Sequence, residues 1–444
     1  MADARPFHWE YVPEAPPPEA FLIEGGRPLD GTVTVSGAKN AALKLLAAAC
    51  LTGERCRFEN VPEIEDVRVL AEVLQDLGVV VDHPEPGVYE VAAGDVDWLF
   101  IPLEAAAKMR ASFILLGPLL ARFGRVIISN PGGDRIGRRP VNLHVDAMRS
   151  LGAEVEYRNG YYYAKAPGRL RGGEVRFPQV TVMGTENAIL AATLADGHTV
   201  IRPAAQEPEI DDLIEFLCKM GADVSRTYPD TIEINGTKRL RGASHSVMPD
   251  RIETGTFLVA AAITGGRLTL ENAACTHVDA LVDVFTQVGV PVHCVDHTID
   301  IDATGIRPGD LQACDIETSP YPGLATDVQP PMCVLLTQAN GTSRVHEAVF
   351  EDRIEWLAEL RKLGAKIDIE DAHHASIHGP ARLHGAEATI GDLRAGASLI
   401  LAALAADGGS LIHGAHHVQR GYENIDRKFQ QLGASIVRSA DTAP

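Results

Sequence analysis

The segment Ala191–Gly197, AATLADG, is an alanine-rich apolar run that ends in glycine, and the turn MGADV follows it at residues 220–224. An apolar run and then a glycine turn of this kind occur six times in the 444 residues. The other runs are Ala47–Gly53, Gly117–Gly124, Ala260–Gly266, Val334–Gly341 and Ala402–Gly408. The turn glycines, 68 to 75 residues apart, are Gly78, Gly152, Gly221, Gly289, Gly364 and Gly433. This period is too long for a solenoid unit and fits a small βαβαββ module, so the sequence predicts six copies of one module.

Local patterns predict the remaining elements of each module. Segments with alternating or β-branched residues, bounded by Gly, Pro or Asn, are typical of strands, as at Thr32–Ser36, Val126–Ser129 and Thr231–Ile234. A second helix in each module ends at the turn glycine, which we expect to be the left-handed residue that follows a helix. Examples of these second helices are Val67–Leu77, Leu143–Leu151 and Glu209–Met220.

The six apolar runs predict helices that are buried on every side, because a helix with no polar face must be surrounded by protein. Polar or charged residues stand just before or at the start of each one. They are Lys39-Asn40, Lys108-Met109-Arg110, Thr185-Glu186-Asn187, Asp250-Arg251, Asp327 and Asp392-Leu393-Arg394. A helix N-terminus offers free N–H groups and a partial positive charge. If the modules are arranged alike, these ends meet in one region, which predicts an anion-binding site.

Composition excludes several classes of partner. The formal net charge is −20 and the pI is near 5.2, which argues against nucleic acid and against an anionic membrane surface. Seven scattered cysteines without a CxxC pair are typical of reduced thiols in the cytosol. The apolar runs are much shorter than the roughly 20 residues that span a bilayer. Residues 1–19, rich in proline and charge, are expected to be a flexible tail.

Nine motifs occur in order along the chain and carry a resemblance to a known family. They are SGAKNAAL (36–43), KMRAS (108–112), PGGDRIGRRPVNLH (131–144), EPEI (207–210), PDRIETGTFLVAAA (249–262), TDVQ (326–329), FEDR (350–353), DLRA (392–395) and RGYE (420–423). Together they resemble the UDP-N-acetylglucosamine 1-carboxyvinyltransferase family of enolpyruvyl transferases, over residues from about 20 to 435. The sister enzymes that make enolpyruvylshikimate phosphate have a serine-rich segment after the lysine, where this chain has Asn40-Ala41-Ala42. They fit less well.

The resemblance implies a fold and a reaction. The fold is a two-domain inside-out α/β barrel with three modules in each domain and the active site between the domains. One domain would comprise residues 40–247, and the other residues 20–39 plus 248–440. The reaction transfers the enolpyruvyl group of phosphoenolpyruvate to the 3′-hydroxyl of UDP-N-acetylglucosamine, through a tetrahedral ketal, in the cytoplasmic synthesis of peptidoglycan precursors. It needs no metal and no organic cofactor, and the resemblance implies no nucleic-acid or membrane partner.

The resemblance also assigns roles to individual residues. Catalytic roles fall on Lys39, Asp134, Asp327 and Arg420, and Asp327 would accept the proton of the sugar hydroxyl. Both substrates are anionic, so many cations are expected in the site, and arginine can bind a carboxylate or phosphate with two parallel hydrogen bonds. The residues assigned to substrate binding are Lys39, Asn40, Arg110, Arg139, Pro140, Val141, Asn142, Leu143, His144, Thr181, Val182, Asp327, Val349, Arg353, Asp392, Arg394 and Arg420.

Two departures from the family pattern bear on function. Family members commonly carry on the mobile lid a cysteine that fosfomycin alkylates, and this chain has Asp134 there, so resistance to the drug is expected. Gln179 stands where the family variant has a lysine near the diphosphate. It keeps open an enolpyruvyl transferase that acts on another uridine nucleotide. A non-catalytic nucleotide-sugar-binding protein is the third alternative, and the oligomeric state is open.

Overall fold

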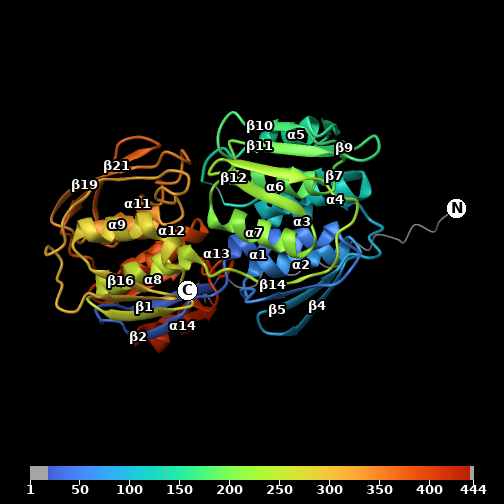
Figure 1. Cartoon of the computed structure of the whole chain (residues 1–444). Helices are drawn as coiled ribbons and strands as arrows, with labels where there is room; N and C mark the ends of the chain where they lie inside the picture. The colour runs from blue at the N-terminus through green and yellow to red at the C-terminus, as the bar shows by residue number, and fades with distance from the viewer. Residues whose placement is uncertain (1–18, 135, 441–444) are drawn as a thin grey trace.

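The computed structural model describes residues 19–134 and 136–440, and it has two lobes side by side (Figure 1). The N-lobe contains the strands β3 (Cys56–Glu59), β4 (Val80–Glu85), β5 (Val88–Ala92), β6 (Phe100–Ile101), β7 (Arg125–Ser129), β8 (Glu154–Arg158), β9 (Tyr161–Lys165), β10 (Glu174–Arg176), β11 (His198–Arg202), β12 (Asp223–Tyr228), β13 (Thr231–Asn235) and β14 (Ser244–Ser246). Its helices are α1 (Lys39–Ala48), α2 (Glu65–Asp76), α3 (Leu103–Lys108), α4 (Leu116–Phe123), α5 (Asn142–Ser150), α6 (Val182–Thr193) and α7 (Pro208–Lys219), with the 3₁₀ turns η1 (Ala49–Leu51) and η2 (Arg110–Leu115).

The C-lobe contains both the first strands of the described chain and the last. Its strands are β1 (Glu19–Glu24), β2 (Asp30–Thr34), β15 (Arg267–Glu271), β16 (Val292–Val295), β17 (Thr298–Asp302), β18 (Ile316–Glu317), β19 (Gly341–His346), β20 (Lys366–Ile369), β21 (His374–Gly379), β22 (Glu387–Thr389), β23 (Gly409–His413) and β24 (Ser435–Ala440). Its helices are α8 (Arg251–Thr264), α9 (Asp279–Val288), α10 (Gln329–Leu336), α11 (Leu357–Lys362), α12 (Leu393–Ala405), α13 (His416–Gln419) and α14 (Ile425–Gln431), with the 3₁₀ turn η3 (Cys275–His277).

The strand pairing repeats six times, which confirms the predicted sixfold α/β architecture. Each of the six four-stranded sheets has one strand parallel to its neighbour, and the other two pairings are antiparallel. In three modules a strand comes from a distant part of the chain. β14 completes the sheet of β3, β2 joins β15, and β1 joins β23 and β24. The chain therefore passes between the lobes twice.

The central helices lie inside their lobes, as their apolar sequences predict. In the C-lobe α8, α10 and α12 pack against one another, and Leu258, Leu335 and Leu399 are fully buried. The buried cluster of the N-lobe runs from Ala38 to Met248, whereas that of the C-lobe combines residues 21–35 with residues 252–436. Within residues 19–134 and 136–440, no helix is both long and apolar enough to cross a bilayer.

Helix ends follow the local signals in most modules. The six turn glycines all have φ between 87° and 97°, which is the conformation predicted for a residue after a helix. Two predicted helix starts are wrong. α6 begins at Val182, one turn earlier than expected, so Thr185-Glu186-Asn187 lies within it. α4 begins at Leu116, because η2 (Arg110–Leu115) separates it from Lys108-Met109-Arg110.

The predicted N-terminal tail falls almost wholly on residues 1–18, outside the described part of the chain. Glu19 already belongs to β1.

Candidate functional site

Two of the predicted catalytic cations meet at a carboxylate between the lobes. Lys39 is the first residue of α1, and its Nζ lies 2.8 Å from Oδ2 of Asp66 on α2. Arg420 of the C-lobe donates from Nε to Oδ1 of the same carboxylate at 3.0 Å. Another nitrogen of Arg420 donates to Asp134, the lid residue of the N-lobe. One buried carboxylate of the N-lobe thus holds both Lys39 and Arg420, and Arg420 also contacts the lid.

Burial and mutual charge set the protonation of this group. Burial lowers the pKa of Lys39, Asp66 raises it, and the charges of Arg394 and Arg420 lower it again, so that the pKa lies below that of an ordinary lysine. Burial acts to raise the pKa of Asp66, but the charges of Lys39 and Arg420 outweigh it and hold that pKa below its usual value. Asp66 is therefore ionised in this arrangement.

Asp327 lies between two buried arginines. Arg353 Nη2 is 2.9 Å from its Oδ1, and Arg394 donates to its Oδ2 from Nε at 3.2 Å and from Nη2 at 3.1 Å. Burial alone would raise the pKa of Asp327, but the charges of Arg394 and Arg353 lower it far below the usual range. The carboxylate of Asp327 is therefore a weak base until another anion binds Arg353 and Arg394 in its place.

A buried glutamate shapes the segment that carries Val349 and Arg353. Oε1 of Glu347 accepts hydrogen bonds from the backbone N–H groups of Val349 at 2.9 Å and Phe350 at 3.1 Å. Its Oε2 accepts one from Thr326 Oγ1 at 2.9 Å, next to Asp327. Glu347 therefore links the segment that contains Asp327 to the segment that contains Arg353.

The Phe350 ring provides a surface for two of the predicted cations. The guanidinium groups of Arg139 and Arg353 lie 5.4 Å and 5.8 Å from its centroid, within the range of cation–π attraction. Burial lowers the pKa of Arg139, and so does the nearby charge of Arg353. Burial and the charge of Arg139 also lower the pKa of Arg110 to about 10. These mutual effects place the arginines of both lobes in one electrostatic cluster.

Two predicted helix starts carry the caps that their sequences indicate. Oδ1 of Asp392 accepts from the N–H groups of Arg394 and Ala395, in the first turn of α12. Asp250 caps α8 in the same way, through Ile252 and Glu253, and also accepts from the N–H of Lys39. These caps hold Lys39 and Arg394 at the same ends of the buried helices. The six predicted cations of the site are Lys39, Arg110, Arg139, Arg353, Arg394 and Arg420, and the carboxylates described among them are Asp66, Asp134, Asp250, Asp327, Glu347 and Asp392.

The segment predicted to bind the nucleotide contains both exposed and buried side chains. Pro140 and Asn142 are exposed, whereas Val141 is buried and Leu143 is half-buried. The side chain of His144 packs into the N-lobe core, where Nδ1 accepts from Asn187 Nδ2 at 2.9 Å. Burial lowers the pKa of His144 to about 3, so this ring is neutral and structural. Asn40, Thr181 and Val182 lie at the starts of α1 and α6, partly exposed.

The lid is held by contacts from both lobes. Gly133 has φ of 105°, and a side chain on Gly132 would overlap the Ala107 carbonyl oxygen. Glu351 of the C-lobe accepts a hydrogen bond from the N–H of Arg138 at 2.8 Å. The two glycines, predicted as a point of backbone freedom, are also required here for close packing.

Three residues of the site were not predicted from the sequence. Asp66 has the sequence signal of an ordinary acidic residue in the first turn of a helix. Glu347 follows the end of a strand, and an acidic residue at that position does not by itself indicate a functional site. Tyr422 packs its ring 5.2 Å from the Arg394 guanidinium, and its hydroxyl is 2.8 Å from Thr256 Oγ1. It belongs to the RGYE motif, which could have indicated it.

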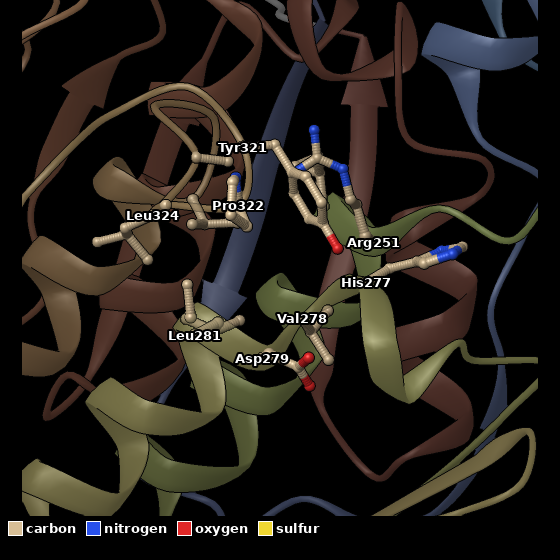
Figure 2. Close-up of a pocket in the computed structure, with 13 residues that line it drawn as sticks. Arg251, His277, Val278, Asp279, Leu281, Tyr321, Pro322 and Leu324 are labelled. Atoms are coloured by element: carbon tan, nitrogen blue, oxygen red, sulfur yellow. The ribbon is translucent and has the colours of Figure 1, made fainter. Parts of the chain in front are cut away.

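A second contact joins the lobes beside a small cavity of about 50 Å³ (Figure 2). Arg251, at the start of α8, donates from Nε to Oε1 of Glu209 on α7 at 3.0 Å. Figure 2 shows the ring of Tyr321 beside Arg251, 5.7 Å from its guanidinium carbon. The N–H of Tyr321 donates to Glu207 Oε1 at 3.3 Å. The EPEI motif therefore lies at the contact between the lobes.

Comparison with known proteins gives concordant results. The family model described as EPSP synthase (3-phosphoshikimate 1-carboxyvinyltransferase) matches residues 23–429. A UDP-N-acetylglucosamine 1-carboxyvinyltransferase of Shewanella denitrificans is 43% identical over 95% of this chain and 99% of its own length. That of Actinobacillus succinogenes is 44% identical over 95% of this chain and its full length.

Solved structures agree on the fold. The enolpyruvyl transferase NikO from Streptomyces tendae has a TM-score of 0.86 at 25% identity, covering 97% of this chain and all of its own. An EPSP synthase from Acinetobacter baumannii has a TM-score of 0.76 at 21% identity, covering 95% of this chain and all of its own.

Proposed function

The chain belongs to the carboxyvinyltransferase family that includes EPSP synthase and UDP-N-acetylglucosamine 1-carboxyvinyltransferase, and from this premise we propose that it forms enolpyruvyl-UDP-N-acetylglucosamine. It transfers the enolpyruvyl group of phosphoenolpyruvate to the 3′-hydroxyl of UDP-N-acetylglucosamine and releases phosphate. The step belongs to peptidoglycan precursor synthesis in the cytoplasm. The 43% identity to relatives with this printed name, over nearly the whole of both chains, supports this acceptor over another uridine nucleotide.

The observation that carries the proposal is Asp327 held between Arg353 and Arg394, with Arg139 beside them. When the phosphate and carboxylate of phosphoenolpyruvate enter, they compete with Asp327 for these guanidinium groups. The carboxylate that loses its arginines regains basicity, because the charges that lower its pKa are neutralised. It then accepts the proton of the sugar hydroxyl as that oxygen attacks the substrate carbon.

The other site cations act on the phosphate side. We propose that Lys39 and Arg420 bind the phosphate, which leaves when the tetrahedral ketal collapses. Asp66 keeps them together before substrate arrives, and the lid residue Asp134 contacts Arg420 from the opposite lobe. Closing the lobes aligns the two substrates and excludes water, from which most of the rate is expected. No residue of this scheme requires a metal or organic cofactor.

We also propose the domain division at residues 40–247 and 20–39 plus 248–440. The pairing of β1 and β2 with C-lobe strands supports it.

Phosphate release from phosphoenolpyruvate with a panel of acceptors tests the proposal. UDP-N-acetylglucosamine should support turnover, and an analogue that lacks the sugar 3′-hydroxyl should support none. Turnover with uridine monophosphate alone would overturn the acceptor. Binding of UDP-N-acetylglucosamine, with no phosphate released from phosphoenolpyruvate in the presence of any acceptor, would show a nucleotide-sugar-binding protein instead.

A further inference from the structure

Two cysteines of the C-lobe meet at a place that the proposed reaction does not use. Cys275 opens η3, and Cys294 lies in the edge strand β16. Both are free thiols, and Cys275 is close enough to Cys294 to raise the pKa of the Cys294 thiol. Cys275 is half-buried and Cys294 is exposed, so small reagents in solution can reach the pair.

Strand register explains independently why the two side chains meet. Cys294 is paired with Ile299 of β17, and residues directly opposite in a sheet point to the same face. Ile299 is fully buried, so Cys294 points toward the core face of the sheet. Cys275 packs against that core, and its Sγ lies 3.7 Å from the carbonyl oxygen of Thr298, the residue beside Ile299. Both side chains therefore lie on the core side of β17, near the end of that strand that carries Thr298 and Ile299.

The residue after Cys275 belongs to the contact between the lobes. The carbonyl oxygen of Thr276 accepts a hydrogen bond from the Tyr321 hydroxyl at 3.0 Å. Figure 2 shows the ring of Tyr321 beside Arg251. Tyr321 in turn contacts Glu207 of the N-lobe through its N–H, and it begins the loop that leads to Asp327. A displacement of η3 therefore acts on both the lobe contact and the proton acceptor's loop.

We propose that Cys275 and Cys294 form a reversible oxidation site, in which a disulfide between them displaces Thr276 and lowers turnover. The oxidant is a low-molecular-weight disulfide such as glutathione disulfide. Part of the inference, the effect on turnover, rests on the proposed function, whereas the disulfide itself does not. Disulfides in reducing compartments are usually transient and serve redox sensing.

The chemistry proceeds by two thiol–disulfide exchanges. The Cys275 thiolate attacks one sulfur of the reagent, and the other sulfur leaves as a thiolate. The Cys294 thiol then gives up its proton to a departing thiolate and attacks Cys275 Sγ, which releases the second half of the reagent. Two protein thiols are oxidised and one reagent disulfide is reduced to two thiols. Burial and the neighbouring Cys275 raise the pKa of Cys294 to about 12, which disfavours Cys294 as the first nucleophile.

The full-length protein, treated with glutathione disulfide and then with dithiothreitol, tests the site. Peptide mapping of the oxidised protein should show a Cys275–Cys294 link that dithiothreitol removes. Cys294→Ser should leave only a mixed disulfide at Cys275, whereas Cys218→Ser, which removes another exposed cysteine, should keep the link. Stable glutathione adducts on Cys275 in the unmodified protein, without the link, would overturn the dithiol.

The same samples test the coupling to activity. Oxidation should lower kcat about three- to tenfold, the effect of losing one hydrogen bond between neutral groups, and reduction should restore it. Tyr321→Phe removes the hydrogen bond to Thr276, so its lower activity should no longer respond to oxidation. Linked protein with unchanged kcat would overturn the coupling and leave the oxidation site standing. Inactivity of the reduced protein with every acceptor would count against the proposed function alone, because the link is read by mass.

Discussion

At the scale of single residues, Asp66 holds the cations proposed to bind phosphate in position when no substrate is bound. It is a buried carboxylate that contacts Lys39 and Arg420, and removing it would leave Lys39 without its ion-pair partner and Arg420 with Asp134 alone. An uncompensated buried charge is much more costly than a missing surface pair. The phosphate of the substrate can supply the same negative charge, so Asp66 preserves the arrangement that the substrate later uses.

Lys39→Ala and Arg420→Ala should each abolish turnover while the fold survives. Each variant loses a charge-assisted contact to the substrate phosphate, which costs on the order of 1.5–3 kcal/mol or more. Steady-state kinetics with phosphoenolpyruvate as the varied substrate, together with a circular dichroism spectrum, measures both effects. Near-normal kinetics in both variants would show that these residues do not bind the phosphate.

Asp327→Asn should fold and bind the nucleotide but transfer poorly. An amide cannot accept the hydroxyl proton, and removing a general base typically costs about 10²–10⁴ in rate. Nucleotide affinity by calorimetry and single-turnover rates separate the two roles. Should affinity fall while bound substrate still reacts at the normal rate, Asp327 is a binding group and the mechanism needs another base.

At the scale of elements, the buried helices of the N-lobe also contact one another through polar side chains. Glu186 of α6 is fully buried, and its Oε1 lies 3.5 Å from Nζ of Lys44 on α1. Burial raises the pKa of Glu186 to about 7, against the effect of Lys44. Asn187 beside it binds the N–H of Gly117 at 2.7 Å and so joins α6 to α4. These polar residues therefore join the helices of the N-lobe.

Glu186→Gln should change how stability depends on pH. Because the folded-state pKa is about 7 and the unfolded value about 4.3, the folded protein binds more protons between these limits, and its stability falls as pH rises through them. The variant lacks this loss, so relative to the unmodified protein it should gain roughly 3 kcal/mol between pH 4.3 and pH 7. Urea unfolding at pH 5.0 and pH 8.0 measures most of this change. An equal difference at both values would contradict the raised pKa.

The lid element gives a prediction about inhibition. The carboxylate of Asp134 is engaged by Arg420 and is a weaker nucleophile toward an epoxide than a thiolate, so the protein should resist fosfomycin. Asp134→Cys should acquire time-dependent inactivation with a covalent adduct on the lid. Activity after preincubation and the intact mass measure it, with Asp134→Ser as the control. Rapid covalent inactivation of the unmodified protein would show that another residue occupies the lid position.

At the scale of the whole molecule, the lobes are joined by buried polar contacts rather than by an apolar interface. Arg251 and Glu209 are both nearly buried, with side-chain exposures of 10% and 4%. Breaking a buried pair by removing one partner costs about 3–5 kcal/mol, against about 0–1 kcal/mol for an exposed pair. The population of the closed arrangement should therefore depend on Arg251.

Arg251→Ala should lower kcat/KM for phosphoenolpyruvate at least about tenfold, since about 1.4 kcal/mol of lost closure corresponds to that factor. Arg382→Ala is the matched control, because Arg382 pairs with Asp407 at 2.9 Å with exposures of 89% and 62%. It should leave kcat/KM unchanged. Small-angle scattering should show a larger radius of gyration for Arg251→Ala only, and equal effects of the two substitutions would remove the closure argument.

The sequence by itself determined the features that depend on neighbouring residues. The sixfold period, the buried helices, the left-handed turn glycines and the caps Asp250 and Asp392 all follow from local periodicity and hydrogen bonding. The motifs also placed Lys39, Asp327, Arg394 and Arg420 in one site, and the structure brings Asp327 to Arg394 and makes all four electrostatic neighbours of one cluster.

Only the tertiary structure decided which charges pair. Asp66 and Arg420 are 354 residues apart in the chain, and Asp134 and Arg420 are 286 apart. No local pattern marks such partners, because an acidic residue in the first turn of a helix reads the same whether water or an arginine of the other lobe faces it. The inward face of His144 has the same origin, because its partner Asn187 lies on another helix, α6. These partners depend on which modules pack together, which the long-range strand pairing and lobe contacts determine.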